Sequence, residues 1–249
     1  MPALSVDKAL AILKEFSASE PLLGVSELGR RLGMTKSTVH RLVGSLVKSG
    51  LAEQDPGSRQ YTLAWESAQL GYTAIYSVPL LRTAFPYLHY LAHQAQETVY
   101  MAMRKGDEAY PVLQVLSPTL REQLDWYRRI PLHSTSTGKV LLAYGEESVL
   151  RKLLAKGLPA PTAHTITDPV ELRQELDKVR EQGFAACFEE DEPGVNGIAV
   201  PVRDPDGSVV AALAVAGPAY SLTHDKAYAA VEQLKAISGE ITQKLREAR

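Results

Sequence analysis

Basic and hydroxyl side chains gather on one predicted helix near the N-terminus, residues 36–49, KSTVHRLVGSLVKS. At about 100° per residue, the centre of its polar face falls on Ser37, Arg41 and Lys48. The opposite face is apolar at Val39, Leu42, Val43, Leu46 and Val47. An arginine can pair bidentately with guanine in the major groove, and a helix N-terminus attracts phosphate. We therefore expect DNA contacts from Lys36, Ser37, Thr38, His40 and Arg41.

The charge around this helix is basic although the whole chain is nearly neutral. The 249 residues include 27 Lys and Arg and 29 Asp and Glu, a formal net charge of −2. Between Leu28 and Ala52 no residue is acidic, whereas five are basic: Arg30, Arg31, Lys36, Arg41 and Lys48. A local basic face of this kind is the electrostatic footprint of a nucleic-acid-binding protein.

A second cluster of candidate binding groups lies at Pro131–Lys139, where four hydroxyl residues in a row, STST, precede Gly138 and open a predicted helix that ends near Tyr144. Free backbone N–H groups at a helix start form a small anion site, and a glycine lets a ligand come close. The pattern is not GxxxxGK[ST], so a nucleotide-binding P-loop is not expected. An ordinary capped helix is an equally good interpretation of these residues alone.

The remaining reactive side chains indicate no catalysis. Cys187 is the single cysteine, and a lone cysteine on a predicted strand is usually a small buried hydrophobe. The acidic run Glu189–Glu192 lacks the spaced ligands of a calcium loop, so we expect a solvated turn. The sequence therefore predicts no enzyme activity, no metal site and no cofactor.

The elements around the basic helix form a recognisable unit. Two helices, residues 5–16 and 26–32, precede it, with Ser26 and Thr35 as expected N-caps and Gly33 as a turn residue. Leu51–Leu63 alternates around Asp55-Pro56-Gly57 and predicts a β-hairpin that carries Arg59 and Gln60. Three helices followed by a hairpin predict a winged helix-turn-helix, with Arg59 near the DNA backbone. A winged helix used for protein contacts is the alternative.

The rest of the chain predicts a linker helix and an α+β domain. A helix over 65–77 is broken at Val78-Pro79, and a longer one spans 80–96. Strands are expected at 98–106, 109–117, 123–130, 184–189, 198–203 and 209–215, and helices at 146–156, 169–182 and 223–249. This order predicts a mostly antiparallel sheet covered by helices. The expected domains are 1–64, 65–79 and 80–249.

Composition places the protein among ordinary globular chains. Apolar residues make up 45% and charged residues 22% of the sequence. A single cysteine excludes an intrachain disulfide and favours a reducing cytoplasm. The N-terminus lacks the pattern of a signal peptide, and no run of about 18 apolar residues predicts a membrane helix.

Blocks spread over nearly the whole chain resemble the isocitrate lyase regulator (IclR) family of bacterial transcription regulators. They are SVDKALAILKEF, ELGRRLGMTKSTVHRLVGSLVKSGL, IPLHSTSTGKVLLA and EEDEPGVNGIAVPVRDPDGSVVAALAVAGP. The resemblance implies an N-terminal winged helix, a linker helix and a C-terminal effector domain with a GAF-like or PAS-like fold. It also implies dimers, or dimers of dimers, on palindromic operators, acting as repressors or activators.

The same resemblance places an effector pocket between the start of the helix at 134–138 and neighbouring strands. The residues it implies are Ser134, Ser136, Thr137, Gly138, Cys187, Val195, Asn196, Gly197, Ile198, Ala214 and Ala216. Effectors in the family are commonly small organic or aromatic acids. Cys187, Gly197, Ala214 and Ala216 stand where polar or larger side chains can occur, which favours a more apolar, aromatic ligand or a pocket filled in another way.

The sequence thus predicts a cytoplasmic regulator that binds double-stranded operator DNA, senses a small carboxylate and has no membrane partner. Dimerisation would place two recognition helices about 34 Å apart, or a multiple of that distance. Two alternatives remain open: a C-terminal domain with enzymatic activity, and a winged-helix protein that senses no small molecule.

Overall fold

The computed structural model describes residues 4–17, 19–117 and 130–248. Its chain divides into two compact units, Met1–Ser77 and Val78–Arg249. Each unit has its own hydrophobic core. The predicted strand at 123–130 lies outside the described residues except for Ile130, which forms an isolated bridge with Ala109.

Three helices form the body of the first unit: α1 (Leu4–Leu13), α2 (Val25–Leu32) and α3 (Lys36–Lys48). The prediction that Ser26 caps α2 is wrong, because the helix already begins at Val25 and Gly24 is its N-cap. Gly33 ends α2 in the left-handed region, with φ of 62°. Thr35 caps α3 as predicted, since its side chain accepts a hydrogen bond from the Thr38 amide.

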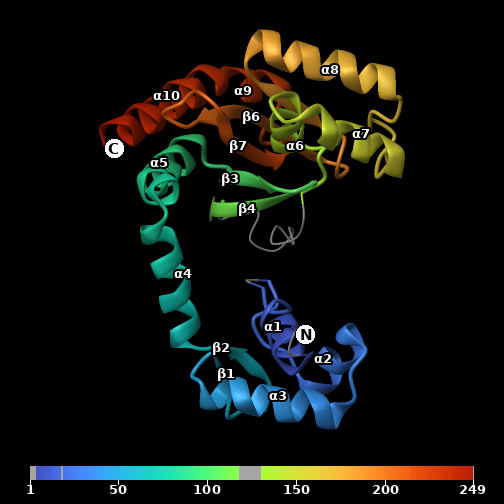
Figure 1. Cartoon of the computed structure of the whole chain (residues 1–249), viewed down its shortest axis with the longest axis vertical. Helices are drawn as coiled ribbons and strands as arrows, with labels where there is room; N and C mark the ends of the chain where they lie inside the picture. The colour runs from blue at the N-terminus through green and yellow to red at the C-terminus, as the bar shows by residue number, and fades with distance from the viewer. Residues whose placement is uncertain (1–3, 18, 118–129, 249) are drawn as a thin grey trace. The chain divides into compact units, whose positions relative to one another are not determined.

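A short hairpin completes this helix-turn-helix unit (Figure 1). Strands β1 (Ala52–Gln54) and β2 (Tyr61–Leu63) pair in antiparallel register. The turn between them is closed by Asp55, whose Oδ1 accepts a hydrogen bond from the Ser58 amide at 2.6 Å. Leu23 bridges Tyr61, and Tyr61 and Ala52 pack into the same core as Val39 and Val43 of α3. The hairpin is therefore packed against the helices, as a wing should be.

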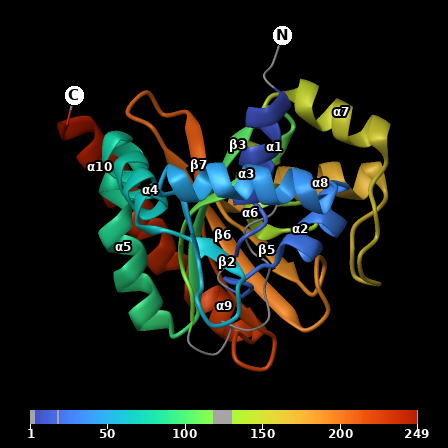
Figure 2. The ribbon, with the colours of Figure 1, turned by 90° about the horizontal axis from the view of Figure 1, so that it is seen from below.

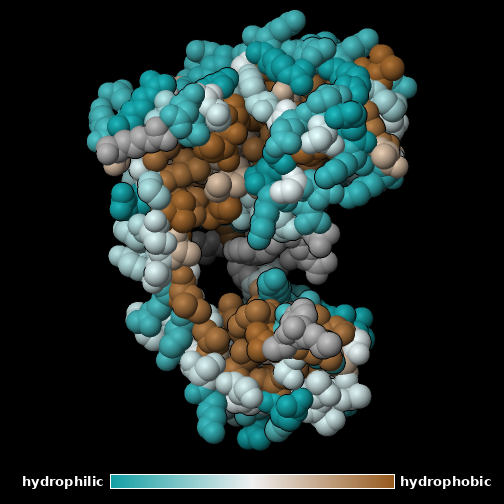
Figure 3. All heavy atoms as spheres, in the orientation of Figure 1, coloured by the Kyte–Doolittle hydropathy of each residue, from teal (hydrophilic) through white to brown (hydrophobic). Residues whose placement is uncertain are grey.

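Helix α4 (Trp65–Ser77) follows the wing and buries none of its residues within the chain. Trp65, Tyr72 and Tyr76 are spaced by seven and four residues, which places them on one face of the helix. Their exposed fractions are 69%, 62% and 43%. Hydrophobic side chains are open to view along α4 and over α1 (Figure 3). An apolar helix face that the rest of the chain leaves uncovered is typical of a protein–protein contact surface.

The second unit is an antiparallel sheet between two groups of helices. In chain order it contains α5 (Pro79–Ala95), β3 (Thr98–Lys105), β4 (Glu108–Val115), α6 (Ser136–Ala143), α7 (Glu147–Lys156), α8 (Pro169–Gln182), β5 (Ala185–Phe188), β6 (Val195–Arg203), β7 (Val209–Pro218), α9 (His224–Ala229) and α10 (Val231–Glu247). The predicted single helix at 223–249 is wrong, since α9 ends at Ala229 and α10 begins at Val231.

The strand order is β4-β3-β7-β6-β5, with every pairing antiparallel. Helices α6, α7 and α8 lie on one side of the sheet and α5 and α10 on the other (Figures 1 and 2). The face under α6 carries mostly small side chains, among them Ala199, Ala212 and Ala214. Small residues let α6 lie close to the sheet, and all eight of its residues are buried.

Candidate functional site

The polar face of α3 is open to solvent. Lys36, Ser37, His40 and Arg41 are exposed, and Thr38 is half-buried. Thr35 links the hydroxyls at the helix start, because its Oγ1 lies 3.1 Å from Ser37 Oγ and donates to Thr38 Oγ1 at 2.9 Å. The helix therefore presents an ordered hydroxyl cluster beside a cationic face. Val47, predicted on the apolar face, is 39% exposed and contributes less to the core than its neighbours.

The basic run is smaller than it looks in sequence, because acids outside it neutralise two of its members. Arg31 pairs with Glu20 at 2.9 Å and with Glu27 at 2.6 Å, and Arg30 pairs with Glu27 at 2.5 Å. Hydrogen bonds from Arg30 and Arg31 lower the pKa of Glu27 to about 2. Within the described residues, Lys36, Arg41 and Lys48 have no acidic partner. The positive charge left for an external anion is thus concentrated on α3.

Arg59 sits at the end of the hairpin turn with φ of 63°. Few non-glycine residues adopt this left-handed conformation. The local backbone holds it, since the Arg59 amide donates to the Asp55 carbonyl at 2.9 Å and its carbonyl accepts from Gln54 Nε2 at 2.9 Å. Its side chain is exposed, so the wing offers a cation at a fixed backbone position.

At the start of α6 the hydroxyl groups are engaged within the protein. Thr135 is the N-cap, with Oγ1 accepting from the Gly138 amide at 3.0 Å and donating to the Pro131 carbonyl at 2.6 Å. Ser134 Oγ donates to Asp191 Oδ1 at 2.6 Å, and Thr137 Oγ1 lies 3.2 Å from the buried Tyr100 hydroxyl. Burial raises the pKa of Tyr100 to about 12, so this phenol stays protonated.

The glycine in this segment serves the packing of its own loop. A Cβ on Gly138 would lie 2.6 Å from both Leu132 Cα and Thr135 Oγ1, and closer still to the Pro131 carbonyl oxygen. Any side chain here would therefore push the preceding loop off the helix. This is a structural reason for glycine that does not depend on a ligand.

Strand alternation brings part of the predicted effector set together. Residues paired across strands share a sheet face, and Gly197 pairs with both Cys187 and Ala216. A Cβ on Gly197 would lie 3.1 Å from Ser136 Oγ, and the Cys187 thiol donates to the Ser134 carbonyl at 3.0 Å. Val195 lies two residues before Gly197 on β6, and Ala214 lies two residues before Ala216 on β7, so they share the same sheet face. This face lies against α6.

Asn196 and Ile198 are not brought to this place. Each is one residue from Gly197, and successive side chains on a strand point to opposite faces. Asn196 Nδ2 donates to the Leu222 carbonyl at 2.9 Å, in the segment before α9. The sequence predicts a strand that begins at residue 198, whereas β6 begins at Val195. The resemblance implied all of residues 195–198 as pocket residues, although successive side chains on a strand point to opposite faces of the sheet.

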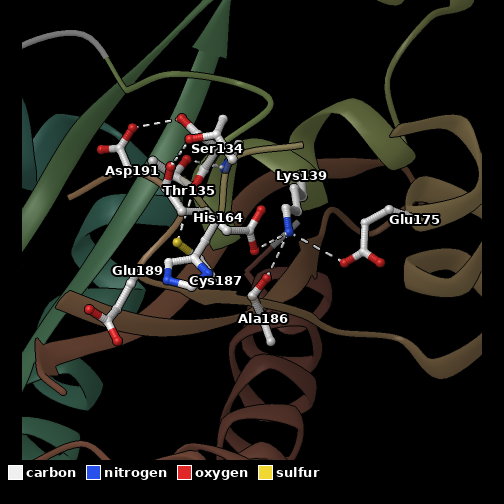
Figure 4. A network of polar contacts seen from close by, with 12 residues as sticks. Ser134, Thr135, Lys139, His164, Glu175, Ala186, Cys187, Glu189 and Asp191 are labelled. Atoms are coloured by element: carbon white, nitrogen blue, oxygen red, sulfur yellow. Dashed lines mark hydrogen bonds and ion pairs between the residues drawn. The ribbon is translucent and has the colours of Figure 1, made fainter. Parts of the chain in front are cut away.

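A buried ion network next to α6 was missed from the sequence (Figure 4). Lys139 is 1% exposed, and its Nζ lies 2.6 Å from Glu190 Oε1, 3.0 Å from the Ala186 carbonyl oxygen and 3.4 Å from Glu175 Oε1. The expectation of a solvated acidic turn is therefore wrong for Glu190. Burial raises the pKa of Glu190, and the Lys139 charge opposes that rise. One charged residue inside an otherwise apolar helix, GKVLLA, was the available signal.

The acidic turn is held from a second side as well. Thr162 Oγ1 donates to the Glu189 carbonyl at 2.7 Å, and Thr165 Oγ1 donates to the Glu190 carbonyl at 2.6 Å. Glu189 adopts φ of 56°, and its Oε2 accepts from the Gly194 amide at 2.8 Å. The turn is thus fixed to α6 and to the loop before α8 at the same time.

Cys187 behaves as the small buried residue that the sequence predicted. It is 6% exposed, and burial raises the pKa of its thiol to about 11. A thiolate nucleophile is therefore not available near neutral pH. In the described parts of the chain no cluster of His, Cys, Asp and Glu could hold a metal ion. None of the described helices has the length and apolar character needed to cross a bilayer.

Two sequence profiles match the chain. The IclR helix-turn-helix domain matches residues 5–56, and the bacterial transcriptional regulator IclR C-terminal domain matches residues 72–243. Among curated proteins, the HTH-type transcriptional regulator KdgR of Dickeya chrysanthemi is 32% identical over 96% of this chain and 81% of its own length. The Pca regulon regulatory protein of Pseudomonas putida is 32% identical over 85% of this chain and 73% of its own length.

Solved structures agree with the profiles. An IclR regulator from Alicyclobacillus acidocaldarius has a TM-score of 0.85 at 27% identity, covering 98% of this chain and 100% of that one. An IclR homologue from Microbacterium hydrocarbonoxydans, complexed with 4-hydroxybenzoate, has a TM-score of 0.82 at 26% identity, covering 98% and 99%. The matched family consists of transcription regulators, which sets the enzyme alternative aside. The chain belongs to the IclR family and is a DNA-binding regulator with an effector-binding C-terminal domain.

Proposed function

We propose that the chain binds a palindromic operator as a homodimer or dimer of dimers, and that a small carboxylate in its C-terminal domain controls this binding. Residues 1–64 would read DNA, 65–79 would link, and 80–249 would bind effector and oligomerise. The observation that carries the proposal is the set of unpaired cations on α3, next to arginines that are paired. A ligand shifts such an equilibrium only if it binds one arrangement of the DNA-binding heads more tightly than another.

The DNA-reading set is Lys36, Ser37, Thr38, His40 and Arg41 on α3, with Arg59 on the wing. In this proposal Arg41 reaches base edges and Lys36 contacts a phosphate at the helix start. The preferred sequence can be selected from a random duplex library. Replacing Arg41 by Ala should then cost about 1–3 kcal/mol of operator affinity and relax the preference at one base.

Arg30→Ala is the matched control, because Arg30 lies in the same unit but is occupied by Glu27. At fixed salt it should leave base preference unchanged. If Arg41→Ala also left the preference unchanged, the reading face would lie elsewhere.

The effector set comprises the residues that share the α6 side of the sheet: Ser134, Ser136, Thr137, Gly138, Cys187, Val195, Gly197, Ala214 and Ala216. We place the ligand's carboxylate at the first N–H groups of α6 and its apolar body over the alanines and glycine of the sheet. The hydroxyls here are already bonded, and Asp191 lies beside Ser134. Few polar anchors remain, which favours an aromatic acid over a highly polar one.

Calorimetry with 4-hydroxybenzoate, the ligand of the Microbacterium homologue, and with the matching benzamide tests this proposal. The acid should bind and the neutral amide should not. Ala214→Leu should abolish binding because it places a larger side chain on the sheet face toward α6, whereas Ile198→Leu, on the opposite face, should not. Loss of binding in the Ile198 variant alone would place the ligand on the other side of the sheet.

Helix α4 supports a dimer. Its aromatic face, Trp65, Tyr72 and Tyr76, has no core of its own, and the last two rings stack at 4.3 Å. A second copy of the same helix would bury this face on both chains. Tyr72→Glu should therefore lower the oligomeric state in sedimentation, while Ala74→Glu, which adds the same charge on the opposite face of the helix, should change it less. Equal behaviour of the two variants would place the dimer contact outside α4.

A further inference from the structure

Two buried oxygen atoms without a hydrogen-bond partner lie on the sheet face away from α6. They are Glu97 Oε2, just before β3, and Asn196 Oδ1 on β6. Glu97 is 6% exposed and Asn196 is 2% exposed. Unpaired buried acceptors are rare because they lose their water without gaining a donor. The two atoms therefore require an explanation.

The sheet register brings these residues to opposite sides of one glycine. Gly217 on β7 pairs with Asn196, and the pairing of Thr98 with Ala216 places Glu97 beside Gly217 on the other side. A Cβ on Gly217 would lie 2.6 Å from Glu97 Cδ. The carboxyl group thus lies over the glycine, about 5 Å, one strand spacing, from the Asn196 backbone. Only a residue without a side chain permits this approach.

The orientation of the Asn196 amide is set by its other partner. Nδ2 donates to the Leu222 carbonyl at 2.9 Å. Rotating the amide would turn its oxygen toward that carbonyl oxygen, so the amide nitrogen must stay there. The remaining amide oxygen, Oδ1, is an acceptor without a donor, and the Glu97 carboxyl group on the other side of Gly217 is, when ionised, also only an acceptor.

We propose that Glu97 is protonated in the folded protein and donates its carboxyl hydrogen to Asn196 Oδ1 across Gly217, so that a shared proton ties β3 to β6. A single hydrogen satisfies both unpaired oxygens. Burial raises the pKa of Glu97, against the lowering effects of the Ser221 hydroxyl and the Lys226 charge. The acid–amide pair would make the effector domain less stable as pH rises.

The charged and titratable groups around the pair come from α9 and the segment before it. Lys226 on α9 donates to the Ser221 carbonyl at 2.9 Å, so its ammonium group is already partnered. The His224 and Phe188 rings stack with their centroids 3.8 Å apart, and Phe188 on β5 pairs with Asn196 on β6. An ionised Glu97 balanced by Lys226 is the competing arrangement.

The test compares Glu97→Gln with the wild type in thermal and denaturant unfolding of the full chain between pH 5 and 9. A glutamine amide can donate to Asn196 Oδ1 but does not titrate. Since the folded pKa of Glu97 is raised, the folded state holds a proton that the unfolded state has lost. The ratio of the wild-type folding constant to that of the variant should fall as pH rises, by up to tenfold per pH unit. This fall is expected between the pKa of Glu97 in the unfolded state and its pKa in the folded state. Above the folded pKa the ratio should be constant again.

Two controls identify the group responsible. If Glu97 is protonated, Lys226→Met should leave the pH dependence of the ratio in place. If Lys226 instead balances an ionised Glu97, the same variant should make that pH dependence much stronger. His224→Gln removes the nearby histidine and should not change the ratio. Direct detection is available from the infrared carboxylic-acid band, which should vanish in Glu97→Gln. A ratio that is flat with pH, or absence of that band at neutral pH, would overturn the proposal; a cation bridging the oxygens would instead show as stabilisation by added salt.

Discussion

Two buried polar clusters in the effector unit solve the same problem in opposite ways. Lys139 gathers acceptors from α8, β5 and the acidic turn, so its charge is compensated by Glu190, Glu175 and a carbonyl. Glu97 Oε2 and Asn196 Oδ1 are both acceptors, and neither has a hydrogen-bond partner. The first cluster is held by charge and the second needs a proton. Buried polar groups are therefore not one class, because each depends on what its neighbours can donate.

Removing the cation should produce the largest effect. Lys139→Met leaves Glu190 buried beside Glu175 with no compensating charge, and breaking a buried pair in this way costs about 3–5 kcal/mol. Urea unfolding measures this loss directly. The acidic turn should also loosen, which amide hydrogen exchange at residues 189–194 would detect.

The matched control for this prediction removes both charges. Lys139→Met combined with Glu190→Met replaces the pair with apolar groups of similar volume, and such replacements are often neutral or stabilising. The double variant should recover most of the lost stability. If it were as unstable as Lys139→Met, the packing of the lysine chain, and not charge balance, would hold this region.

A substitution at Gly217 should have the next largest effect, and it distinguishes the second cluster from the first. Gly217→Ala places a methyl group where the Glu97 carboxyl lies, which should cost about 1–3 kcal/mol through overpacking. It should also abolish the pH dependence assigned to Glu97, because the carboxyl group must leave Asn196. Gly197→Ala meets only Ser136 Oγ, at 3.1 Å, and should cost less without altering the pH profile. Equal losses in the two variants would contradict a specific contact over Gly217.

Local patterns were sufficient for most of the first unit, although α2 is capped by Gly24 and not by Ser26. The apolar spacing of α3, the Thr35 cap and the turn at Asp55 depend on residues within a few positions of one another, and the structure has each of them. The helix expected at 169–182 is also present as α8, with Asp168 as its N-cap and Gly183 at its C-terminal end. Helices and hairpins are determined by short-range geometry, so a single sequence reveals them.

The clusters of the second unit depend on distant residues and could not be found in that way. Lys139 and Glu190 are 51 residues apart, and an acidic run considered alone looks like a solvated turn. The resemblance to the family implied Asn196 and Ile198 as pocket residues together with Gly197. Alternation along β6 places their side chains on the other face of the sheet. Arg31 pairs with Glu20 and Glu27, which precede the acid-free stretch 28–52, so the composition of that stretch alone does not reveal these ion pairs.

The smallest effect is expected at Ser134, where the first cluster meets the candidate effector site. Ser134→Ala removes the bond to Asp191, which is 2.6 Å long, and leaves a carboxylate that is already partly exposed to water. The loss of stability should therefore be only about 0.5–1.5 kcal/mol in urea unfolding. A carboxylate ligand should bind to Ser134→Ala more tightly than to the wild type only if Asp191, released from Ser134, moves away from the start of α6. Asp191→Asn separates these effects, because it keeps an acceptor for Ser134 but removes the negative charge next to the α6 N–H groups. Tighter binding of 4-hydroxybenzoate to Asp191→Asn than to Ser134→Ala would mean that the acidic turn tunes affinity through its charge; the reverse order would mean that it acts through the position of the turn.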